Sequence, residues 1–371
     1  MLTRLYRLQG AEQDWAPALE DAAGVLRSGG LVAFPTETVY GLGANALDPR
    51  AVRRIFEAKG RPQDNPLIVH VASTDQVRGL VRSLPRVAER LMEAFWPGPL
   101  TLVLPRLPVV PLEVTAGLET VGVRFPSHPV AQAMLRAAGV PVAAPSANRS
   151  GRPSPTTAQH VMEDMEGRVE VVLDGGPCGV GVESTVVDCT TPRLRLLRPG
   201  GVTPQDLERV AGPVDVDPRV LKVGRGGGID PGVSADADTE AGEDDLGPVA
   251  SPGMKYRHYA PQGEATLFEG DKTALPAALL RAAEEAAGRG LTVAIVASDE
   301  ALADYRGPGH CISLGSRRGP AGMASALFGA LRRCDQLGAG RVLLEGVEPE
   351  GVGLAIANRL RRAAGGRVVR L

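Results

Sequence analysis

The strongest constraint on the fold is an abrupt change of composition between residues 224 and 253, where the chain reads GRGGGIDPGVSADADTEAGEDDLGPVASPG. Glycine, aspartate and glutamate dominate this segment, so it buries too little apolar surface to offset the entropy lost on ordering. At 371 residues the chain is also too long for one ordinary domain. The sequence therefore predicts two domains, residues 1–212 and 263–371, joined by a linker over 213–262 whose acidic part, 229–250, is flexible.

Short apolar runs alternate with helical periodicity in the first domain, which predicts an α/β sheet whose strand order the sequence does not reveal. The expected strands cover 31–34, 67–71, 100–104, 121–125, 140–144, 169–173 and 185–188. The expected helices lie near 16–28, 49–59, 74–95, 129–138 and 157–166.

The second domain has the same alternation on a smaller scale. Strands near 265–268, 291–297, 311–314 and 341–346 alternate with helices near 273–288, 320–337 and 353–364. This pattern predicts βαβ units on a small, Rossmann-like parallel sheet. No G-x-G-x-x-G follows a strand here, so nothing favours a dinucleotide.

Composition excludes several classes of protein. The four cysteines form no Cys-x-x-Cys pair and have no histidine at metal spacing, which argues against a zinc site and fits a reducing compartment. No apolar run approaches the ~18 residues of a membrane span, and the first ten residues lack a signal-peptide core, so we expect a cytoplasmic protein. The net charge of −2 does not favour broad nucleic-acid binding, although a local RNA contact stays open.

The run DPRAVRRIFEAKGRP predicts a helix whose end presents two cations. Asp48 and Pro49 suit the N-cap and first turn, and Gly60 suits a left-handed C-terminal position. Lys59 and Arg61 then lie side by side where the helix ends. Cations are common at this place because they offset the helix dipole, so the pattern alone does not require a ligand.

The strand TVGVRF places Thr120, Gly122 and Arg124 on one face by simple alternation. A guanidinium beside a bare backbone could receive a carboxylate or a phosphate. A solvent-facing strand would have the same pattern, so both interpretations remain open. His70, in the apolar strand NPLIVHV, is by itself more typical of a core residue than of a ligand.

Hydroxyl and amide groups also lie beside predicted strands, and α/β proteins build their sites where strands end. Thr36, Thr38, Ser146, Asn148 and Ser154 come after strands, Ser184 and Thr185 lead into one, and Arg198 ends another. Turn formation would explain each one separately. Together with Lys59, Arg61 and Arg124, they would balance the roughly four negative charges of a nucleotide triphosphate. The residues alone thus predict an α/β enzyme or binder with an anionic ligand, and no G-K-[ST] marks a Walker-type site.

Several motifs occur together and in order: PTETVYGLG, KGRP with NPL, WPGPLTLVL, VRFPSHP, APSANRSG, ESTVVD and LRPGG. This set resembles the Sua5/YrdC/YwlC family of threonylcarbamoyl-AMP synthases. SPGMKYRHYAP at 251–261 and GVGLAIANRLRRAA at 351–364 resemble the longer, two-domain Sua5 form.

The resemblance implies a twisted first-domain sheet with a large positive cavity. It implies a nucleotidyltransferase that converts L-threonine, bicarbonate and ATP to threonylcarbamoyl-AMP and pyrophosphate, for modification of adenosine 37 in tRNA by a separate transfer complex. Mg²⁺ would arrive with ATP, since the sequence shows no dedicated carboxylate cage.

The resemblance also assigns residues. The family's K-x-R and S-x-N signatures fall on Lys59, Arg61, Ser146 and Asn148, which we take as the catalytic set. The implied threonine site is Thr38, His70, Arg124, Ala144 and Ser184. The implied ATP site is Lys59, Arg61, Asn65, Thr120, Ser146, Ser154 and Arg198. The linker's end would cover the cavity as a lid through Lys255, Tyr256, Arg257 and Tyr259.

Two alternatives belong to other functional classes. The first is a double-stranded RNA-binding protein that makes no adenylate, a role that the balanced charge does not favour. The second is carbamoyl transfer, as in related hydrogenase-maturation domains. Those domains occur beside zinc-finger-like cysteines, which this chain lacks.

Overall fold

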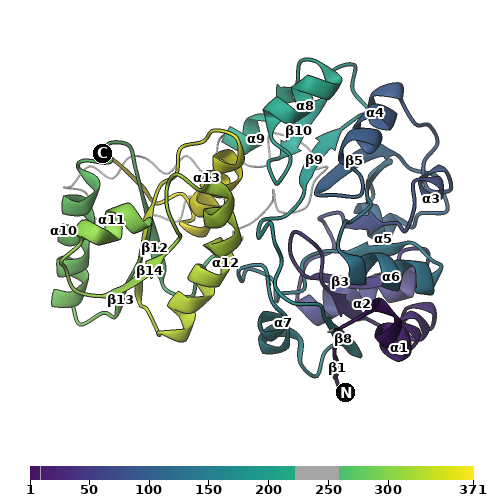
Figure 1. Cartoon of the computed structure of the whole chain (residues 1–371), viewed down its shortest axis with the longest axis horizontal. Helices are drawn as coiled ribbons and strands as arrows, with labels where there is room; N and C mark the ends of the chain where they lie inside the picture. The colour runs from purple at the N-terminus through teal and green to yellow at the C-terminus, as the bar shows by residue number, and fades with distance from the viewer. Residues whose placement is uncertain (9, 222–258) are drawn as a thin grey trace.

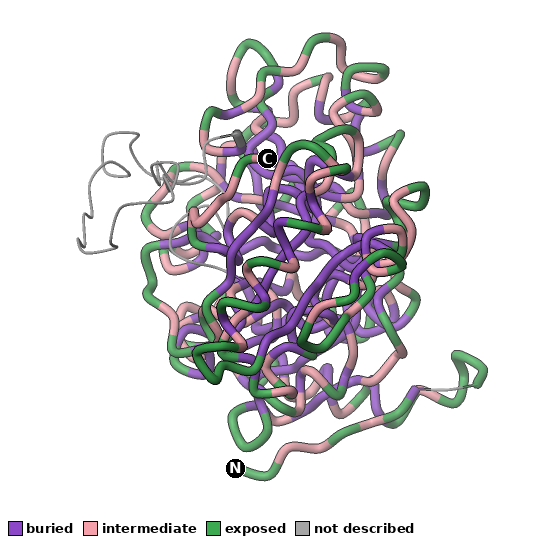
Figure 2. Tube along the Cα trace, turned by 90° about the vertical axis from the view of Figure 1, so that its left-hand side faces the viewer, coloured by how far each residue is buried: buried purple, intermediate pink, exposed green. Residues whose placement is uncertain are grey.

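The computed structural model describes residues 1–8, 10–221 and 259–371, and these form two sheets with their helices (Figure 1). The acidic segment 229–250 and three of the expected lid residues, Lys255, Tyr256 and Arg257, lie outside the described residues. No described helix is both long and apolar enough to cross a membrane. Figure 2 shows buried positions along the strands through the middle of the molecule and exposed ones on the outer loops.

The first sheet has eleven strands in the order β1-β8-β2-β3-β7-β4-β6-β5-β9-β10-β11. Their bounds are β1 Arg4–Arg7, β2 Val32–Phe34, β3 Gly41–Asn45, β4 Ile68–His70, β5 Leu100–Pro105, β6 Thr120–Arg124, β7 Val142–Ala144, β8 Val171–Asp174, β9 Thr185–Asp188, β10 Arg195–Arg198 and β11 Asp215–Val216. The sheet mixes parallel and antiparallel pairs. The strand order departs widely from the chain order, so segments far apart in sequence meet at one edge.

Helices pack on this sheet and connect its strands. They are η1 Glu12–Trp15, α1 Ala16–Arg27, α2 Pro49–Lys59, α3 Asp75–Arg78, α4 Arg86–Phe95, α5 Leu112–Thr115, α6 Pro129–Ala138, α7 Ala158–Met165, α8 Pro204–Ala211 and α9 Pro218–Leu221. Helix α2 begins and ends as its sequence predicts. The Asp48 side chain accepts from the Arg50 backbone N–H, and Gly60 takes the left-handed conformation at φ 61°.

The second sheet has five strands in the order β14-β13-β15-β12-β16, and every pair in it is parallel. Its strands are β12 Glu264–Glu269, β13 Val293–Ala297, β14 His310–Ser313, β15 Arg341–Glu345 and β16 Val368–Arg370. Its helices are α10 Leu275–Gly288, α11 Asp299–Asp304, α12 Pro320–Gln336 and α13 Val352–Ala363. In Figure 1, α10 and α11 lie on the outer face, while α12 and α13 lie between the two sheets. The expected small parallel sheet is confirmed.

The expected helix over 74–95 is wrong in its middle. Helix α3 ends at Arg78 and α4 begins only at Arg86. Pro85 is the N-cap of α4, and a residue before proline is disfavoured in the helical region, so the helical pattern could not run through. Strands β1, β3 and β16 and the helices α5, α8 and α11 were not predicted. Strand β11 and helix α9, which fall in the expected linker, lie at the edge of the first sheet.

Candidate active site

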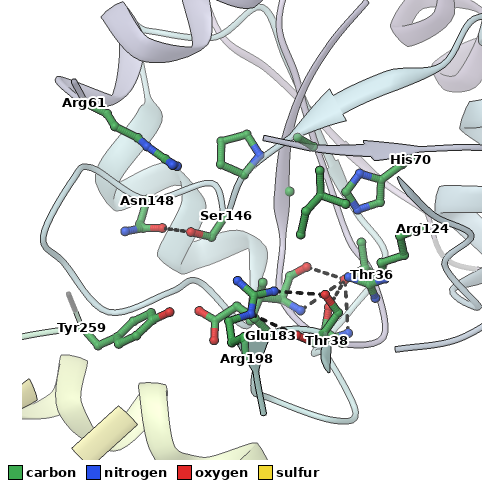
Figure 3. A pocket seen from close by; sticks show the side chains of 16 residues that line it. Thr36, Thr38, Arg61, His70, Arg124, Ser146, Asn148, Glu183, Arg198 and Tyr259 are labelled. Atoms are coloured by element: carbon green, nitrogen blue, oxygen red, sulfur yellow. Dashed lines mark hydrogen bonds between the residues drawn. The ribbon is translucent and has the colours of Figure 1, made fainter. Parts of the chain in front are cut away.

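One cavity gathers most of the predicted residues, with about 630 Å³ of empty space including its open mouth. Its walls are Thr36, Thr38, Val39, Gly41, Arg61, Ile68, His70, Arg124, Ala144, Pro145, Ser146, Asn148, Glu183, Ser184, Arg198 and Tyr259. In Figure 3, Arg61 and the Ser146–Asn148 pair lie on one side, His70 and Arg124 on the opposite side, and Arg198, Glu183 and Tyr259 below them.

Strand direction explains why His70, Arg124 and Arg198 meet. β4 and β6 are parallel and in register, with His70 opposite Arg124. β6 is antiparallel to β5, β5 is parallel to β9, and β9 is antiparallel to β10, so β10 runs in the same direction as β6. The three residues are therefore the last residues of three strands that point the same way. This edge of the sheet is where α/β proteins place their ligands.

Arg124 and His70 form a buried polar corner of the cavity. Arg124 pairs with Glu37 at 2.7 Å and donates through Nε to the Gly98 carbonyl at 3.4 Å. Burial, followed by the nearby Arg124 charge, lowers the pKa of His70 to about 3, so its ring is neutral at physiological pH. Its Nδ1 has no hydrogen-bond partner among the described residues. A buried polar atom without a hydrogen bond destabilises the folded protein, so this nitrogen is a candidate to bond a ligand.

Ser184 and Arg198 are held together at the base of the cavity. Arg198 donates through Nε to the Ser184 carbonyl and through Nη2 to Ser184 Oγ, both at 3.0 Å. Thr101 Oγ1 lies 2.8 Å from the same Ser184 Oγ. Burial lowers the pKa of Arg198 to about 10, and that of Arg61 likewise to about 10, so both remain cationic at neutral pH.

Lys59 lies behind the wall of the cavity. Its Nζ donates to the backbone carbonyls of Ser146 and Asn148, so it holds the loop that carries both residues. Ser146 Oγ in turn lies 2.5 Å from Asn148 Oδ1. Burial lowers the pKa of Lys59 well below its ordinary value. Arg61, by contrast, lines the cavity and donates to the Asn65 carbonyl at 3.1 Å.

Two family models match the chain. The Sua5/YciO/YrdC model, described as telomere recombination, matches residues 24–200, and the C-terminal domain model of threonylcarbamoyl-AMP synthase matches residues 202–365. A threonylcarbamoyl-AMP synthase of Pyrococcus abyssi is 44% identical over 100% of both chains. The chain belongs to the Sua5 family of threonylcarbamoyl-AMP synthases.

Two further relatives agree with this family. A synthase of Bacillus subtilis is 45% identical over 95% of both chains. The crystal structure of P. abyssi Sua5 complexed with L-threonine matches 100% of both chains with a TM-score of 0.87 and 43% identity. The two-domain Sua5 form expected from the motifs is therefore confirmed.

The Sua5 assignments by motif divide into three groups in this structure. Thr38, Arg61, His70, Arg124, Ala144, Ser146, Asn148, Ser184, Arg198 and Tyr259 line the cavity. Lys59, Asn65 and Ser154 are buried and do not line it. Thr120 does not line it either, because it begins β6 whereas Arg124 ends the strand.

Two carboxylates of this Sua5 site were not singled out from the sequence. Glu37 pairs with Arg124, and Glu183 lines the cavity directly. Both lie in family motifs, PTETVYGLG and ESTVVD, and this is the sequence feature that could have pointed to them. An acidic side chain was not expected beside anionic ligands, and its partner residues could not be read from sequence spacing. No described His, Cys, Asp or Glu residues form a group of three or more that could hold a metal.

Proposed function

We propose that this protein synthesises threonylcarbamoyl-AMP from L-threonine, bicarbonate and ATP and releases pyrophosphate. The observation that carries the proposal is the convergence of Arg61, Arg124 and Arg198 from three separate parts of the chain on one cavity, in a chain that matches synthases along its whole length. The reaction makes the protein a nucleotidyltransferase.

The threonine subsite is proposed at Thr38, His70, Arg124, Ala144 and Ser184. Arg124 has five N–H donors, more than its contacts with Glu37 and Gly98 use, so it can also hold the substrate carboxylate. The neutral His70 ring offers a hydrogen-bonding nitrogen without adding a charge. Support comes from the relative that was crystallised with L-threonine.

The ATP subsite is proposed at Arg61, Ser146 and Arg198 in the cavity, with Asn148 beside them. Lys59, Asn65 and Ser154 would act from behind the wall, and the bound nucleotide would have to reach beyond this cavity to contact Thr120. We propose that Mg²⁺ enters as Mg·ATP, held chiefly by phosphates and water.

The proposed reaction needs positioning and charge neutralisation rather than a protein nucleophile. Bicarbonate gives CO₂ and hydroxide, the neutral threonine amine attacks the CO₂ to form the N–C bond, and the proton that the amine loses combines with the hydroxide as water. A carbamate oxygen then attacks the α-phosphorus, and the bond to the pyrophosphate oxygen breaks. Arg61 and Arg198 would stabilise the charge that moves onto the leaving group.

Tyr259 is the described part of the proposed lid. It lines the cavity, takes a left-handed φ of 65° and packs on Phe328 of α12 with ring centroids 5.2 Å apart. A closed lid would protect the labile adenylate from water. We further propose that the product passes, in the cytoplasm, to a tRNA threonylcarbamoyl-transfer complex, with any direct RNA contact being local.

One assay tests the proposed function. Purified protein with Mg·ATP and bicarbonate should release pyrophosphate only when threonine is supplied, and threonylcarbamoyl-AMP should appear by mass spectrometry. Equal release with serine, or none with threonine, would refute it. RNA affinity that falls steeply with salt, without adenylate formation, would instead support the RNA-binding alternative.

A further inference from the structure

The C-terminal domain forms part of the structure that holds the cavity. Val39 and Val182, from two cavity loops of the first domain, are buried in the same hydrophobic cluster as Phe328 of α12. The loop containing Gly181 approaches this helix so closely that a Cβ there would lie 2.3 Å from the Cα of Ser325. Only glycine fits at this contact, so the loop is pressed directly on α12.

Arg359 of α13 extends this contact with a charge. It is fully buried, and its Nε and Nη2 lie 3.1 Å and 3.0 Å from Glu183 Oε2. Its Nη1 donates to the Pro199 carbonyl at 2.5 Å. One guanidinium of the C-terminal domain therefore binds two separate loops of the first domain.

The first of these loops carries residues of the site. The second carboxylate oxygen of Glu183 accepts a 2.5 Å hydrogen bond from Ser154 Oγ. Glu183 also directly precedes Ser184, which lines the cavity beside it. The orientation that Arg359 gives to this carboxylate thus fixes the Ser154 hydroxyl.

The second loop carries Arg198, immediately before Pro199. This loop lies against the first one: a Cβ on Gly200 would lie 2.3 Å from the backbone nitrogen of Thr185. The carbonyl of Pro199 is therefore fixed from one side by Arg359 and from the other by the backbone beside Ser184. A shift of this loop would move the Arg198 guanidinium.

Charge balance gives Arg359 a second role. Glu183 is a buried carboxylate in a cavity that would receive the phosphates of ATP, and an unneutralised negative charge there would repel them. Burial alone would raise its pKa, yet Arg359 and then Arg198 keep the pKa of Glu183 below its ordinary value. Without Arg359, Arg198 would be the described cation left to neutralise Glu183, and less of its positive potential would act on a phosphate.

We infer that Arg359 of the C-terminal domain is a positioning residue for ATP, because it neutralises Glu183 and holds the loops that carry Ser154 and Arg198. The inference rests on the proposed function and assigns a task to the second domain within it. Arg359 does not line the cavity, so it acts through these residues and through Tyr259, whose ring centroid lies 5.9 Å from the Arg359 guanidinium carbon.

Binding and kinetics of the full chain test this role. Arg359→Met should raise both the dissociation constant of Mg·ATP, measured by titration calorimetry, and the KM for ATP by about tenfold. The KM for threonine should change less, since Ser184 is the one residue of the proposed threonine subsite on a loop that Arg359 hydrogen-bonds in the described part of the chain. Unchanged ATP affinity in folded Arg359→Met would overturn the inference.

Asn358→Ala is a matched control on the same helix. Asn358 is also buried and donates across the domain boundary, to the Val220 carbonyl at 3.0 Å, and within the described residues this hydrogen bond does not involve a residue that lines the cavity. It should keep ATP affinity within about twofold of wild type. An equal loss in this variant would show that Arg359 only holds the domains together.

A double variant keeps the test decisive if Arg359→Met does not fold. Glu183→Gln with Arg359→Met removes both charges of the buried Arg359–Glu183 pair, so it should be tolerated better than the loss of Arg359 alone. Because Arg359 acts largely through the Glu183 charge, adding Arg359→Met to Glu183→Gln should weaken ATP binding by less than about threefold. A further tenfold loss would contradict the inference. ATP binding is measured without turnover, so a wild-type protein that binds ATP but makes no adenylate would refute the proposed function alone.

Discussion

The two sheets differ in what lies at the carboxyl ends of strands that point the same way. In the first sheet, His70, Arg124 and Arg198 end three strands and face an open cavity. In the second, Glu345 ends the central strand β15 and is itself the buried centre of an ion cluster. Both edges are places where α/β proteins bind ligands. The first edge opens on a cavity, whereas protein groups engage the carboxylate at the second edge.

The cluster at the second edge is largely satisfied internally. Glu345 accepts from the Ser298 backbone N–H at 2.6 Å and from Arg317 Nε at 2.7 Å, and Lys272 Nζ lies 4.0 Å away. Lys272 also donates to the Gly346 carbonyl. A Rossmann-like outline therefore does not by itself predict a ligand site, because the chemistry at the strand ends decides.

The largest expected difference between the edges comes from removing a cation at each. Arg124→Ala should raise the KM for threonine by at least about a hundredfold, or ~2.7 kcal/mol, because the substrate carboxylate loses its proposed partner and Glu37 loses its ion-pair partner. Threonine-dependent pyrophosphate release measures this. An unchanged threonine requirement would remove Arg124 from the site.

The matched change at the second edge is Arg317→Ala. Arg317 also pairs with a buried carboxylate, but at an edge that we expect to bind no substrate. Its KM values for threonine and ATP should stay within about twofold of wild type. A large rise in either value would mean that the second edge takes part in the reaction, and the contrast between the edges would fail.

Glu345→Ala should mainly cost stability. It leaves Lys272 and Arg317 without their carboxylate and the Ser298 N–H without its acceptor. Because both cations keep some contact with solvent, we expect a loss of about 2–3 kcal/mol. Urea unfolding at neutral pH measures the loss, and the kinetic constants of the folded fraction should be unchanged. Full stability would show that the cluster does not hold the second domain together.

The acid sensitivity of the first edge should depend on His70. Its folded pKa of about 3 lies below the ordinary 6.5, so unfolding takes up a proton below pH 6.5 and stability falls as the pH drops toward 3. Between pH 7 and pH 5 this one group should remove on the order of 2 kcal/mol. His70→Gln should lack that part of the loss in paired urea titrations, and an identical pH dependence in both proteins would contradict the low pKa.

Local signals in the sequence predicted the elements better than they predicted the site. Helices α2 and α6 were expected at 49–59 and 129–138, and they have these bounds because proline and glycine mark both of their ends. The expectation over 74–95 failed where Pro85 interrupts the pattern.

The site depends on strand order and on long-range partners, neither of which spacing reveals. Arg124 and Arg198 meet only because β4, β6 and β10 point the same way in a sheet whose order departs from the chain order. Lys59 was expected to face the ligand, yet it bonds two carbonyls behind the wall. Glu183 was missed because its partner, Arg359, is 176 residues away.

The smallest expected effect comes from the first turn of α2, at the opposite end of the helix from Lys59 and Arg61. Asp48→Ala removes the N-cap hydrogen bond to the Arg50 N–H and should cost about 1 kcal/mol of stability. Thr203→Ala, at the capping box of α8, should cost a similar amount away from Lys59 and Arg61.

Neither capping variant should change the KM for ATP, because Lys59 and Arg61 are fixed by contacts at the other end of α2, with the carbonyls of Asn148 and Asn65. Fraying at the first turn of a helix stays local when the last turn is held by tertiary contacts. If Asp48→Ala raised the KM for ATP while Thr203→Ala did not, a change at the first turn of α2 would be reaching Lys59 and Arg61 at its other end. The positions of Lys59 and Arg61 would then be set by the whole of α2 rather than by their contacts with the loop that Lys59 holds.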